Sequence, residues 1–167
     1  MRVRAVVLAD THLRAAGRRR LPEAAYRLLD GADIILHAGD VVDESLLATL
    51  ASIAPTLAVL GNNDLGLAHV LPVSRQVDLA GVSVAMIHDS GARQGRAGRL
   101  HRRFPDADVV VFGHSHVPLD ERSPQGQRLF NPGSPTERRS SPHHTLGVLE
   151  AEDGALIDHR IVVVGPQ

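Results

Sequence analysis

Short apolar runs alternate with amphipathic segments along the first half of the chain. Val3 to Ala9 is a continuous aliphatic run, which is typical of a strand buried on both faces. Shorter runs of the same kind occupy residues 33–37 and 56–60. The segments between them, residues 22–30 and 42–53, carry apolar residues at helical spacing. This alternation predicts a parallel sheet with right-handed helical crossovers.

The second half of the chain has a different pattern. Strands are predicted at residues 76–79, 82–88, 109–112, 128–131, 145–150 and 155–164. The first two and the last two of these strands are joined by short connections that contain glycine, which favours hairpins. A short helix is predicted to end near Phe104, and Pro118 to Gly126 is interpreted as a turn-rich connection. The expected architecture is a single α/β domain over residues 1–167, with a parallel half and a mostly antiparallel half.

Composition excludes several classes of protein. The chain has 167 residues, 43% of them hydrophobic, and no apolar run approaches the roughly 18 residues of a membrane span. A net charge of −1 and an aromatic share of 2% argue against a dedicated nucleic-acid or membrane binder. Cysteine is absent, which excludes disulfides and thiolate ligands. The N-terminal segment has no secretory signal pattern, so we expect a cytoplasmic protein.

Residue types that bind metals follow strand after strand. The motifs are Asp10-Thr11-His12, His37-Ala38-Gly39-Asp40, Gly61-Asn62-Asn63-Asp64, His88 and Gly113-His114-Ser115-His116. Ligands of open α/β sheets bind outside the carboxyl ends of the strands, so we expect these side chains on one rim. Carboxylate, imidazole and amide oxygen together suit Mn²⁺, Fe, Zn²⁺, Co²⁺ or Ni²⁺ better than Ca²⁺ or Cu⁺. Seven such groups exceed the needs of one ion, and with Asp40 as a bridge they divide between two ions, as in two-metal hydrolases.

In this order, the motifs resemble those of the calcineurin-like metallophosphoesterase superfamily, from residue 6 to about residue 140. The short length, the Gly-Asn-Asn-Asp form and residues 131–134 (Asn-Pro-Gly-Ser) are similar to its small YfcE-type phosphodiesterase branch. The resemblance implies a two-sheet β-sandwich flanked by helices and two divalent ions, of which manganese is the first candidate. It implies one metal site formed by Asp10, His12, Asp40 and His116, and a second formed by Asp40, Asn62, His88 and His114. It also implies that Asp40, Asn62 and His88 are catalytic.

Two positions depart from the pattern of the resembled family. Asn63 stands where larger members carry a histidine that assists the leaving group. Because a general acid is worth about 10²–10⁴ in rate, we expect modest turnover and a preference for good leaving groups. Asp89 follows His88 at a position where glycine is usual. Asn63 and Asp89 are assigned as candidate substrate-binding residues.

Several other polar residues each have two interpretations. His37 either orients a metal ligand or is a satisfied core histidine. Asp64 either hydrogen-bonds within the site loop or caps a helix that begins near Leu65. Residues 131–134 either contact the site or form an ordinary turn. Four arginines at helical spacing either steer an anionic substrate or form a solvated face: Arg93, Arg96, Arg99 and Arg103.

The expected function is hydrolysis of a small phosphodiester by a metal-bound hydroxide, with a cyclic nucleotide as one candidate substrate. The preference for a diester rests on the resemblance, because the residues alone indicate only phosphoester hydrolysis. One alternative is a phosphomonoesterase or nuclease of the same superfamily. Another is a non-catalytic scaffold similar to the retromer subunit that shares this fold. Every ligand position is filled here, which favours an enzyme over a scaffold. From composition and charge we expect a small phosphodiester as the partner, without a membrane or extended nucleic acid. A homo-oligomer is possible on this sequence.

Overall fold

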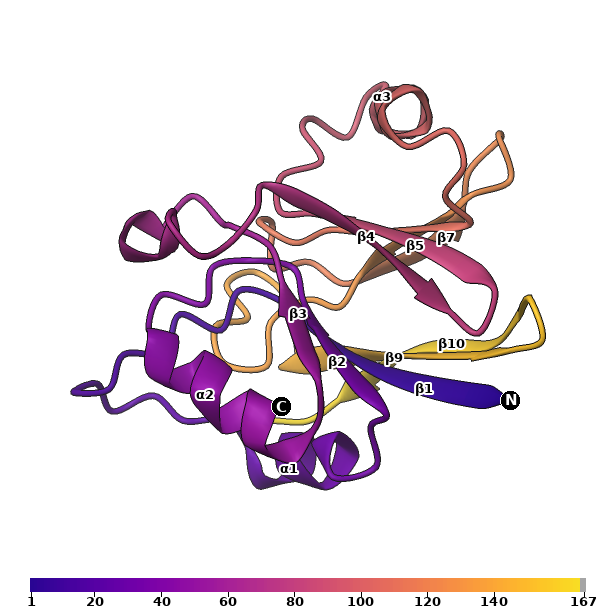
Figure 1. The fold of residues 1–167 in the computed structure, drawn as a ribbon. Helices are drawn as coiled ribbons and strands as arrows, with labels where there is room; N and C mark the ends of the chain where they lie inside the picture. Colours follow the sequence, from indigo (N-terminus) through magenta and orange to yellow (C-terminus); the bar gives the residue numbers. More distant parts are fainter. Residues whose placement is uncertain (166–167) are drawn as a thin grey trace.

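The computed structural model describes residues 1–165 and contains two five-stranded sheets packed face to face (Figure 1). The first sheet has the order β10-β9-β1-β2-β3. Its strands are β1 (Arg2–Leu8), β2 (Ile34–His37), β3 (Thr56–Ala58), β9 (Thr145–Glu152) and β10 (Ala155–Val163). β1, β2 and β3 are parallel, and β9 runs antiparallel to both β1 and β10. The predicted parallel start of the chain is confirmed, and the C-terminal hairpin extends the same sheet.

The second sheet has the order β4-β5-β6-β8-β7. Its strands are β4 (Ser74–Leu79), β5 (Val82–Ile87), β6 (Val109–Val111), β7 (Leu119–Arg122) and β8 (Arg128–Asn131). The expectation of a mostly antiparallel second half is confirmed for the pairs β4–β5, β7–β8 and β9–β10, but not for the centre of this sheet, where β5, β6 and β8 are parallel. Only the edge strands β4 and β7 pair antiparallel. β7 also lies within the segment interpreted as turn-rich, where the mixture of polar residues gives no strand pattern.

Helices cover the outer face of each sheet. Figure 1 shows α1 (Glu23–Leu29) and α2 (Glu44–Ile53) below the first sheet and α3 (Arg96–Arg103) above the second. The Asp43 carboxylate accepts a hydrogen bond of 2.9 Å from the amide of Ser45 and so caps α2. None of the helices in residues 1–165 is long and apolar enough to cross a membrane.

The core is divided by the alternation of side chains along β1. Val7 faces the second sheet and belongs to the apolar cluster that contains Met86 and Phe130. Val6 and Leu8 point the other way and pack in the cluster under α1 and α2. Burial of each such side chain contributes about 1.5–3 kcal/mol. β1 is therefore fixed on both faces, and the position of the loop that follows it is fixed as well.

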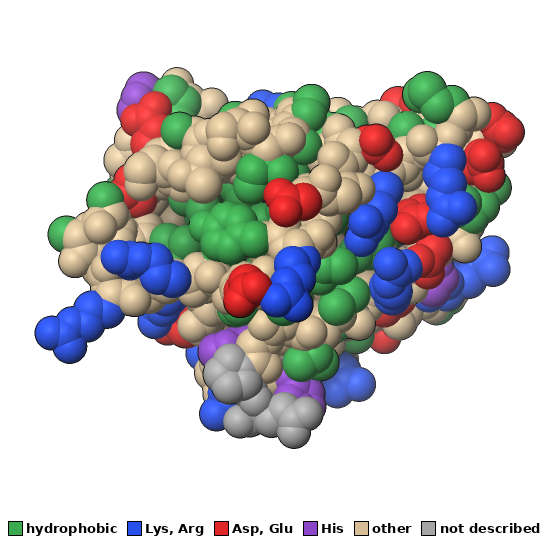
Figure 2. All heavy atoms as spheres, turned by 90° about the horizontal axis from the view of Figure 1, so that it is seen from below, with side chains coloured by type: hydrophobic (Ala, Val, Ile, Leu, Met, Phe, Trp, Pro, Cys, Tyr) green, Lys and Arg blue, Asp and Glu red, His purple; other side chains and the backbone are tan. Residues whose placement is uncertain are grey.

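The surface of the helical layer under the first sheet carries both charges. Figure 2 shows this face, where basic and acidic side chains are interspersed around a central apolar patch. This face therefore lacks the uniform basic surface that would attract a nucleic-acid backbone.

Candidate metal centre

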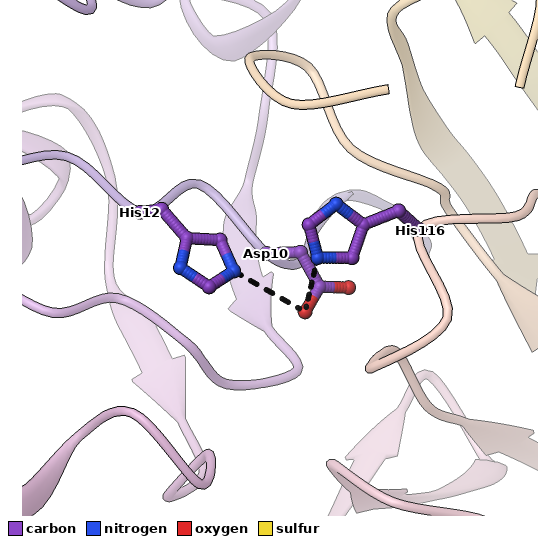
Figure 3. A group of neighbouring side chains, drawn as sticks. All are labelled: Asp10, His12 and His116. Atoms are coloured by element: carbon purple, nitrogen blue, oxygen red, sulfur yellow. Dashed lines mark ion pairs between the residues drawn. The ribbon is translucent and has the colours of Figure 1, made fainter. Parts of the chain in front are cut away.

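The candidate ligands come from five loops that follow β1, β2, β3, β5 and β6. Among them, Asp10, His12 and His116 form one group whose ligand atoms all lie within 4.8 Å of one another. Asp10, Asp40 and His88 form a second group by the same criterion. Figure 3 shows His12 and His116 on either side of the Asp10 carboxylate, with one ring nitrogen of each turned toward it. The sheet topology thus brings five of the seven predicted residues into two overlapping groups.

Two carboxylates lie at the centre of this cluster. Asp10 Oδ1 is 3.5 Å from His116 Nε2, 4.0 Å from His12 Nε2 and 3.8 Å from His88 Nε2. Asp40 Oδ2 is 3.3 Å from His12 Nε2 and 3.4 Å from His88 Nε2. Asp40 therefore lies between the two histidines as the bridging assignment requires, and Asp10 occupies a similar shared position.

Asn62 and His114 extend the cluster toward solvent. Asn62 Oδ1 is 3.1 Å from His88 Nε2 and 3.2 Å from His114 Nδ1. Both Asn62 and His114 are exposed, whereas His88 is buried. All seven predicted residues are thus in one continuous cluster, with these two at its open side.

The backbone at the centre adopts conformations that residues with a side chain rarely take. Left-handed φ angles occur at five candidate ligands: Asp10 (54°), His12 (45°), Asp40 (58°), His114 (72°) and His116 (62°). Each such residue costs on the order of 1–3 kcal/mol and persists only where its surroundings fix it. Strain of this kind concentrates at functional sites, because it points side chains in directions that regular structure does not offer.

Asp64 fixes one of these strained loops. Its buried carboxylate accepts hydrogen bonds from the amides of Asp40 (2.9 Å), Val42 (2.7 Å) and Gly61 (2.8 Å). Its side chain makes no capping bond to the 3₁₀ helix at Leu65–Leu67, so the interpretation as a cap is wrong. The loops approach closely here, because a Cβ on Gly61 would lie 2.2 Å from Asp40 Oδ1. Asp64 therefore acts within the site loops.

The loop after β8 fixes the strained loop that carries Asp10. Ser134 Oγ donates to the carbonyl of Asp10 at 2.8 Å, and Thr136 Oγ1 donates to the carbonyl of Thr11 at 2.6 Å. Asn131 Nδ2 lies 3.2 Å from the carbonyl of Gly113, at the start of the loop to His114. The Asn-Pro-Gly-Ser segment and Thr136 therefore support the backbone of two ligand loops.

His37 lies beneath the same region. Its ring is fully buried, with Nε2 3.0 Å from Thr11 Oγ1 and Nδ1 3.2 Å from the amide nitrogen of Gly39. Burial lowers the pKa of His37 to about 3, so the ring is neutral at physiological pH. His37 packs as a satisfied core histidine, and its partners are the residues next to the candidate ligands.

The two predicted substrate-binding residues lie in different surroundings. Asn63 donates to Asp40 twice at 2.9 Å, from its amide nitrogen to Oδ1 and from Nδ2 to Oδ2. Asp89 accepts a hydrogen bond from the amide of Gly91 at 2.8 Å. Asp89 also lines a cavity of about 550 Å³ with Arg99 and Arg102, and none of the seven candidate ligands lines that cavity. Asn63 is thus part of the cluster, whereas Asp89 faces a different hollow.

The arginines at helical spacing do not form one face. Arg93 precedes α3 and is exposed. The Arg96 guanidinium lies over the Phe112 ring, 5.0 Å from its centroid, and Arg103 lies over Phe104 at 5.5 Å. Arg99 donates to backbone carbonyls of the preceding loop, including that of Gln94 at 2.8 Å. Arg96, Arg99 and Arg103 therefore pack α3 and its loop.

Burial and charge set the protonation of the central groups. Burial raises the pKa of Asp10 to about 7, with the neighbouring charge of Asp40 adding to the rise. Burial would also raise the pKa of Asp40, but hydrogen bonds from His88 and Asn63 outweigh it and hold that pKa well below its usual range. Burial opposes the protonation of His88, yet its hydrogen bond to Asp40 and the two carboxylate charges leave its pKa raised. The cluster therefore contains one carboxylate that stays ionised, Asp40, and one that takes up a proton near neutral pH, Asp10.

Three atoms at the centre are buried without a hydrogen-bond partner in residues 1–165: Asp10 Oδ1, His12 Nε2 and His116 Nε2. Unsatisfied buried groups are rare and call for an explanation such as a bound ion. The other nitrogen of His116 is bonded to the carbonyl of Glu137, and that of His88 lies 2.7 Å from the carbonyl of Ala38. Backbone carbonyls in these places hold a proton on Nδ1 and turn Nε2 toward the carboxylates, where it can bind a metal once it carries no proton. The residues present thus fit a divalent transition metal.

Sequence reasoning missed three charged residues beside the centre. Glu137 Oε2 lies 3.8 Å from His12 Nε2, and Arg19 Nη1 lies 3.3 Å from Glu137 Oε2. Arg139 Nη1 donates to the carbonyl of His114 at 3.4 Å. The only available signal for Glu137 and Arg139 is their place shortly after the Asn-Pro-Gly-Ser turn.

Sequence comparison finds relatives that share most of the length of this chain. A family model described as a calcineurin-like phosphoesterase superfamily domain matches residues 1–154. A probable metallophosphoesterase of Methanothermobacter thermautotrophicus is 33% identical over 163 residues, which cover 95% of this chain and 91% of that protein. A probable metallophosphoesterase of Methanocaldococcus jannaschii is 33% identical over 153 residues, covering 88% of this chain and 75% of that protein.

Solved structures show the same fold. Vps29 from Entamoeba histolytica superposes with a TM-score of 0.77 at 17% identity, covering 97% of this chain and 99% of that one. A structure described as a novel archaeal phosphodiesterase gives a TM-score of 0.71 at 18% identity, covering 96% and 99% of the two chains. At these identities the likeness concerns the fold alone, and it agrees with the two sheets and flanking helices described above.

Proposed function

The chain belongs to the calcineurin-like phosphoesterase superfamily, and from this premise we propose that it is a dinuclear metal-dependent phosphodiesterase acting on a small phosphodiester. The observation that carries the proposal is the set of buried ligand atoms without partners, Asp10 Oδ1, His12 Nε2 and His116 Nε2. A protein that kept this fold only as a scaffold would gain stability by satisfying or replacing these atoms. These unpartnered atoms therefore support an ion at this place.

Asp10, His12, Asp40 and His116 would hold one ion, and Asp40, Asn62, His88 and His114 the other. Two divalent ions, of which Mn²⁺ is the first candidate, would polarise the phosphoryl group and activate water as the nucleophile. Both sets of residues lie at the carboxyl ends of strands, as do the ligand sites of other α/β proteins.

The residues around Asp40 keep the bridge in its ionised form. Asn63 donates two hydrogen bonds to the carboxylate, and this favours the charged state that a bridging ligand needs. The bond between His88 Nδ1 and the carbonyl of Ala38 holds the ring with Nε2 toward Asp40. Asn62 and His114, which are exposed, are the members of the set that a substrate can reach.

The preference for a diester rests on the family resemblance, whereas a preference for good leaving groups follows from Asn63. A primary amide is no proton donor to a leaving alkoxide, so departure depends on the leaving group itself. We expect modest turnover and faster hydrolysis of esters with acidic leaving groups. A cyclic nucleotide remains one candidate for the natural substrate.

Metal content and substrate preference test this proposal. Metal-replete protein should contain about two transition-metal ions per chain by mass spectrometry and should hydrolyse bis-p-nitrophenyl phosphate faster than p-nitrophenyl phosphate with Mn²⁺. Less than one ion per chain would favour a scaffold, and preference for the monoester would favour a phosphomonoesterase. Asp40→Ala should abolish turnover and lower the metal content, whereas Asp106→Ala should change neither, because Asp106 is exposed and lies in the turn after α3. Retained turnover in Asp40→Ala would contradict the bridging assignment.

A further inference from the structure

Arg139 is a charged residue that the metal assignment does not use. It lies in the loop after β8, its side chain is exposed, and its backbone is left-handed with φ 49°. Its Nη1 donates to the carbonyl of His114 at 3.4 Å, so the guanidinium sits against the loop that carries His114 and His116. That bond uses one of the five donors of the guanidinium and leaves the rest for another partner.

The charge of Arg139 acts on one side of the centre. It is among the charges that lower the pKa values of Asp10, His12 and His116. It is not among the main influences on the pKa of Asp40 or His88. The guanidinium contacts the His114 loop and its charge acts on Asp10, His12 and His116.

The other charges on this side do not neutralise Arg139. Arg19 is paired with Glu137, whose carboxylate oxygen is 3.3 Å from its guanidinium. No carboxylate in residues 1–165 lies within 4 Å of Arg139. An exposed, unpaired guanidinium at the mouth of the centre attracts anions, and its flat fork of donors matches a phosphate.

We propose that Arg139 binds a second anionic group of the substrate, a phosphate beyond the scissile one, so that the preferred substrates are phosphodiesters that carry an additional phosphate. The inference rests on the proposed function, which places the scissile phosphoryl group at the metal ligands. The cations would engage that group within the cluster, whereas Arg139 is exposed and contacts the carbonyl of His114 beside it. A phosphate bound to Arg139 takes no part in the bond that is cleaved, so it contributes to the choice of substrate.

Arg138 offers a matched control. It is the preceding residue in the same loop and is also exposed. Its guanidinium donates to the carbonyl of Ser141 at 3.0 Å and acts on His144, not on the candidate ligands. Arg138→Gln and Arg139→Gln therefore make the same change in net charge, and only the second removes a donor beside the centre.

The experiment compares two chromogenic substrates, thymidine 5′-(p-nitrophenyl phosphate) and its 3′-phosphorylated form, which share the scissile bond and the leaving group. With metal-replete wild-type protein, kcat/KM should be about tenfold higher for the 3′-phosphorylated substrate, the effect of one or two charge-assisted hydrogen bonds. Arg139→Gln should bring the ratio close to one, and Arg138→Gln should keep it. Calorimetry should show the same pattern in binding, with thymidine 3′,5′-bisphosphate bound about tenfold tighter than thymidine 5′-monophosphate only while Arg139 is present.

The outcomes separate this inference from the proposed function. Hydrolysis of both substrates without preference in the wild type, or a preference that survives in Arg139→Gln, would overturn the role of Arg139 and leave the phosphodiesterase intact. A preference lost equally in Arg138→Gln would also overturn it, because the effect would then be one of net charge. Absence of any hydrolysis by metal-replete wild-type protein would overturn the proposed function and this inference with it.

Discussion

The two sides of the candidate metal centre differ in how far they are assembled without an ion. The inner set, Asp10, His12 and His116, is largely buried, and its ligand atoms have no hydrogen-bond partner in residues 1–165. The outer set comprises Asn62, His88 and His114, in which the Asn62 side-chain oxygen joins the two histidines. Asn62 and His114 are also open to solvent. The inner set is thus prepared for an ion, and the outer set is satisfied without one.

This difference indicates the order in which ions should bind. An unsatisfied buried polar group costs about 1–3 kcal/mol, and an ion bound at the inner set would remove that cost. An ion at the outer set must first displace the contacts of Asn62 with His88 and His114, so its binding is less favourable in free energy. We therefore expect a tighter inner site and a weaker outer site, with Asp40 serving both.

The largest effect should come from removing a ligand of the inner set. His116→Ala should lower phosphodiester turnover by at least about 10³-fold and remove the tighter metal-binding event, because the ring is fully buried against Asp10. Asn62→Ala should remove only the weaker event. Titration with Mn²⁺ followed by calorimetry measures both, and equal loss of both events in Asn62→Ala would show that the two sets are not distinct.

The next largest effect should come from Asp64, which holds the loops of Asp40 and Gly61. Asp64→Asn keeps one acceptor oxygen but places an amide donor opposite backbone N–H groups, which leaves at least one donor of the strained loop unpaired. We expect metal affinity to fall about 10- to 100-fold and unfolding free energy to fall by about 1–3 kcal/mol. Metal titration and urea unfolding measure these changes, with Asp106→Asn as the exposed control. Unchanged affinity would show that the loop keeps its shape without Asp64.

Substitution of His37, which lies beneath the loops of the inner set, should have a smaller effect: it should change how the unfolding free energy depends on pH. Its pKa is about 3 in the folded protein and near 6.5 when unfolded, so its contribution to stability is complete above about pH 6.5. That contribution is lost as pH falls toward 3, because only the unfolded chain takes up the proton. Between pH 7 and 5, chelator-treated wild-type protein should lose about 1–2 kcal/mol more unfolding free energy than His37→Gln. Parallel pH profiles of the two proteins in urea unfolding would contradict the buried neutral state.

The smallest effect should come from a gain of function at the outer side. Asn63→His restores a proton donor near the leaving group but removes the side-chain bond from Asn63 to Asp40. The two changes oppose each other, so we expect only a few-fold gain in turnover, confined to esters with poor leaving groups. Hydrolysis rates of two phosphodiesters that differ only in having an alkyl or a p-nitrophenyl leaving group measure this gain. An unchanged ratio would show that the leaving group does not limit the reaction.

The sequence predicts the strands and the place of the site, because each motif directly follows an apolar run. The apolar runs Val3 to Ala9 and Val109 to Phe112 correspond to β1 and β6, and the motif residues that follow them meet at one edge. β7 could not be predicted, because its Asp120 is polar and pairs with Arg128 and His159 across strands. Such a pattern depends on partners in other strands, which the local sequence of β7 does not reveal.

The details of the centre depend on backbone angles and distant loops. The left-handed φ angles at Asp10, His12 and Asp40 could not be predicted from the sequence. Such angles are normally predicted at glycine, and none of these residues is glycine. Glu137 and Arg139 reach the centre from a loop more than 120 residues after Asp10, and no local spacing connects them. The sequence therefore predicts the candidate ligands, while the supporting contacts require the fold.

The hydrogen bonds from Ser134 and Thr136 to the Asp10 loop span 124 and 125 residues of chain. During synthesis, the loop after β1 emerges first, and the two bonds to its carbonyls form only when this late segment arrives. Local folding of the N-terminal strands and helices can precede that event, since their contacts are close in sequence. The inner set should become competent to bind a metal only after the segment beyond β8 has docked. Metal capture in this protein would then mark the completion of folding and would stabilise the finished chain over its partly folded precursors.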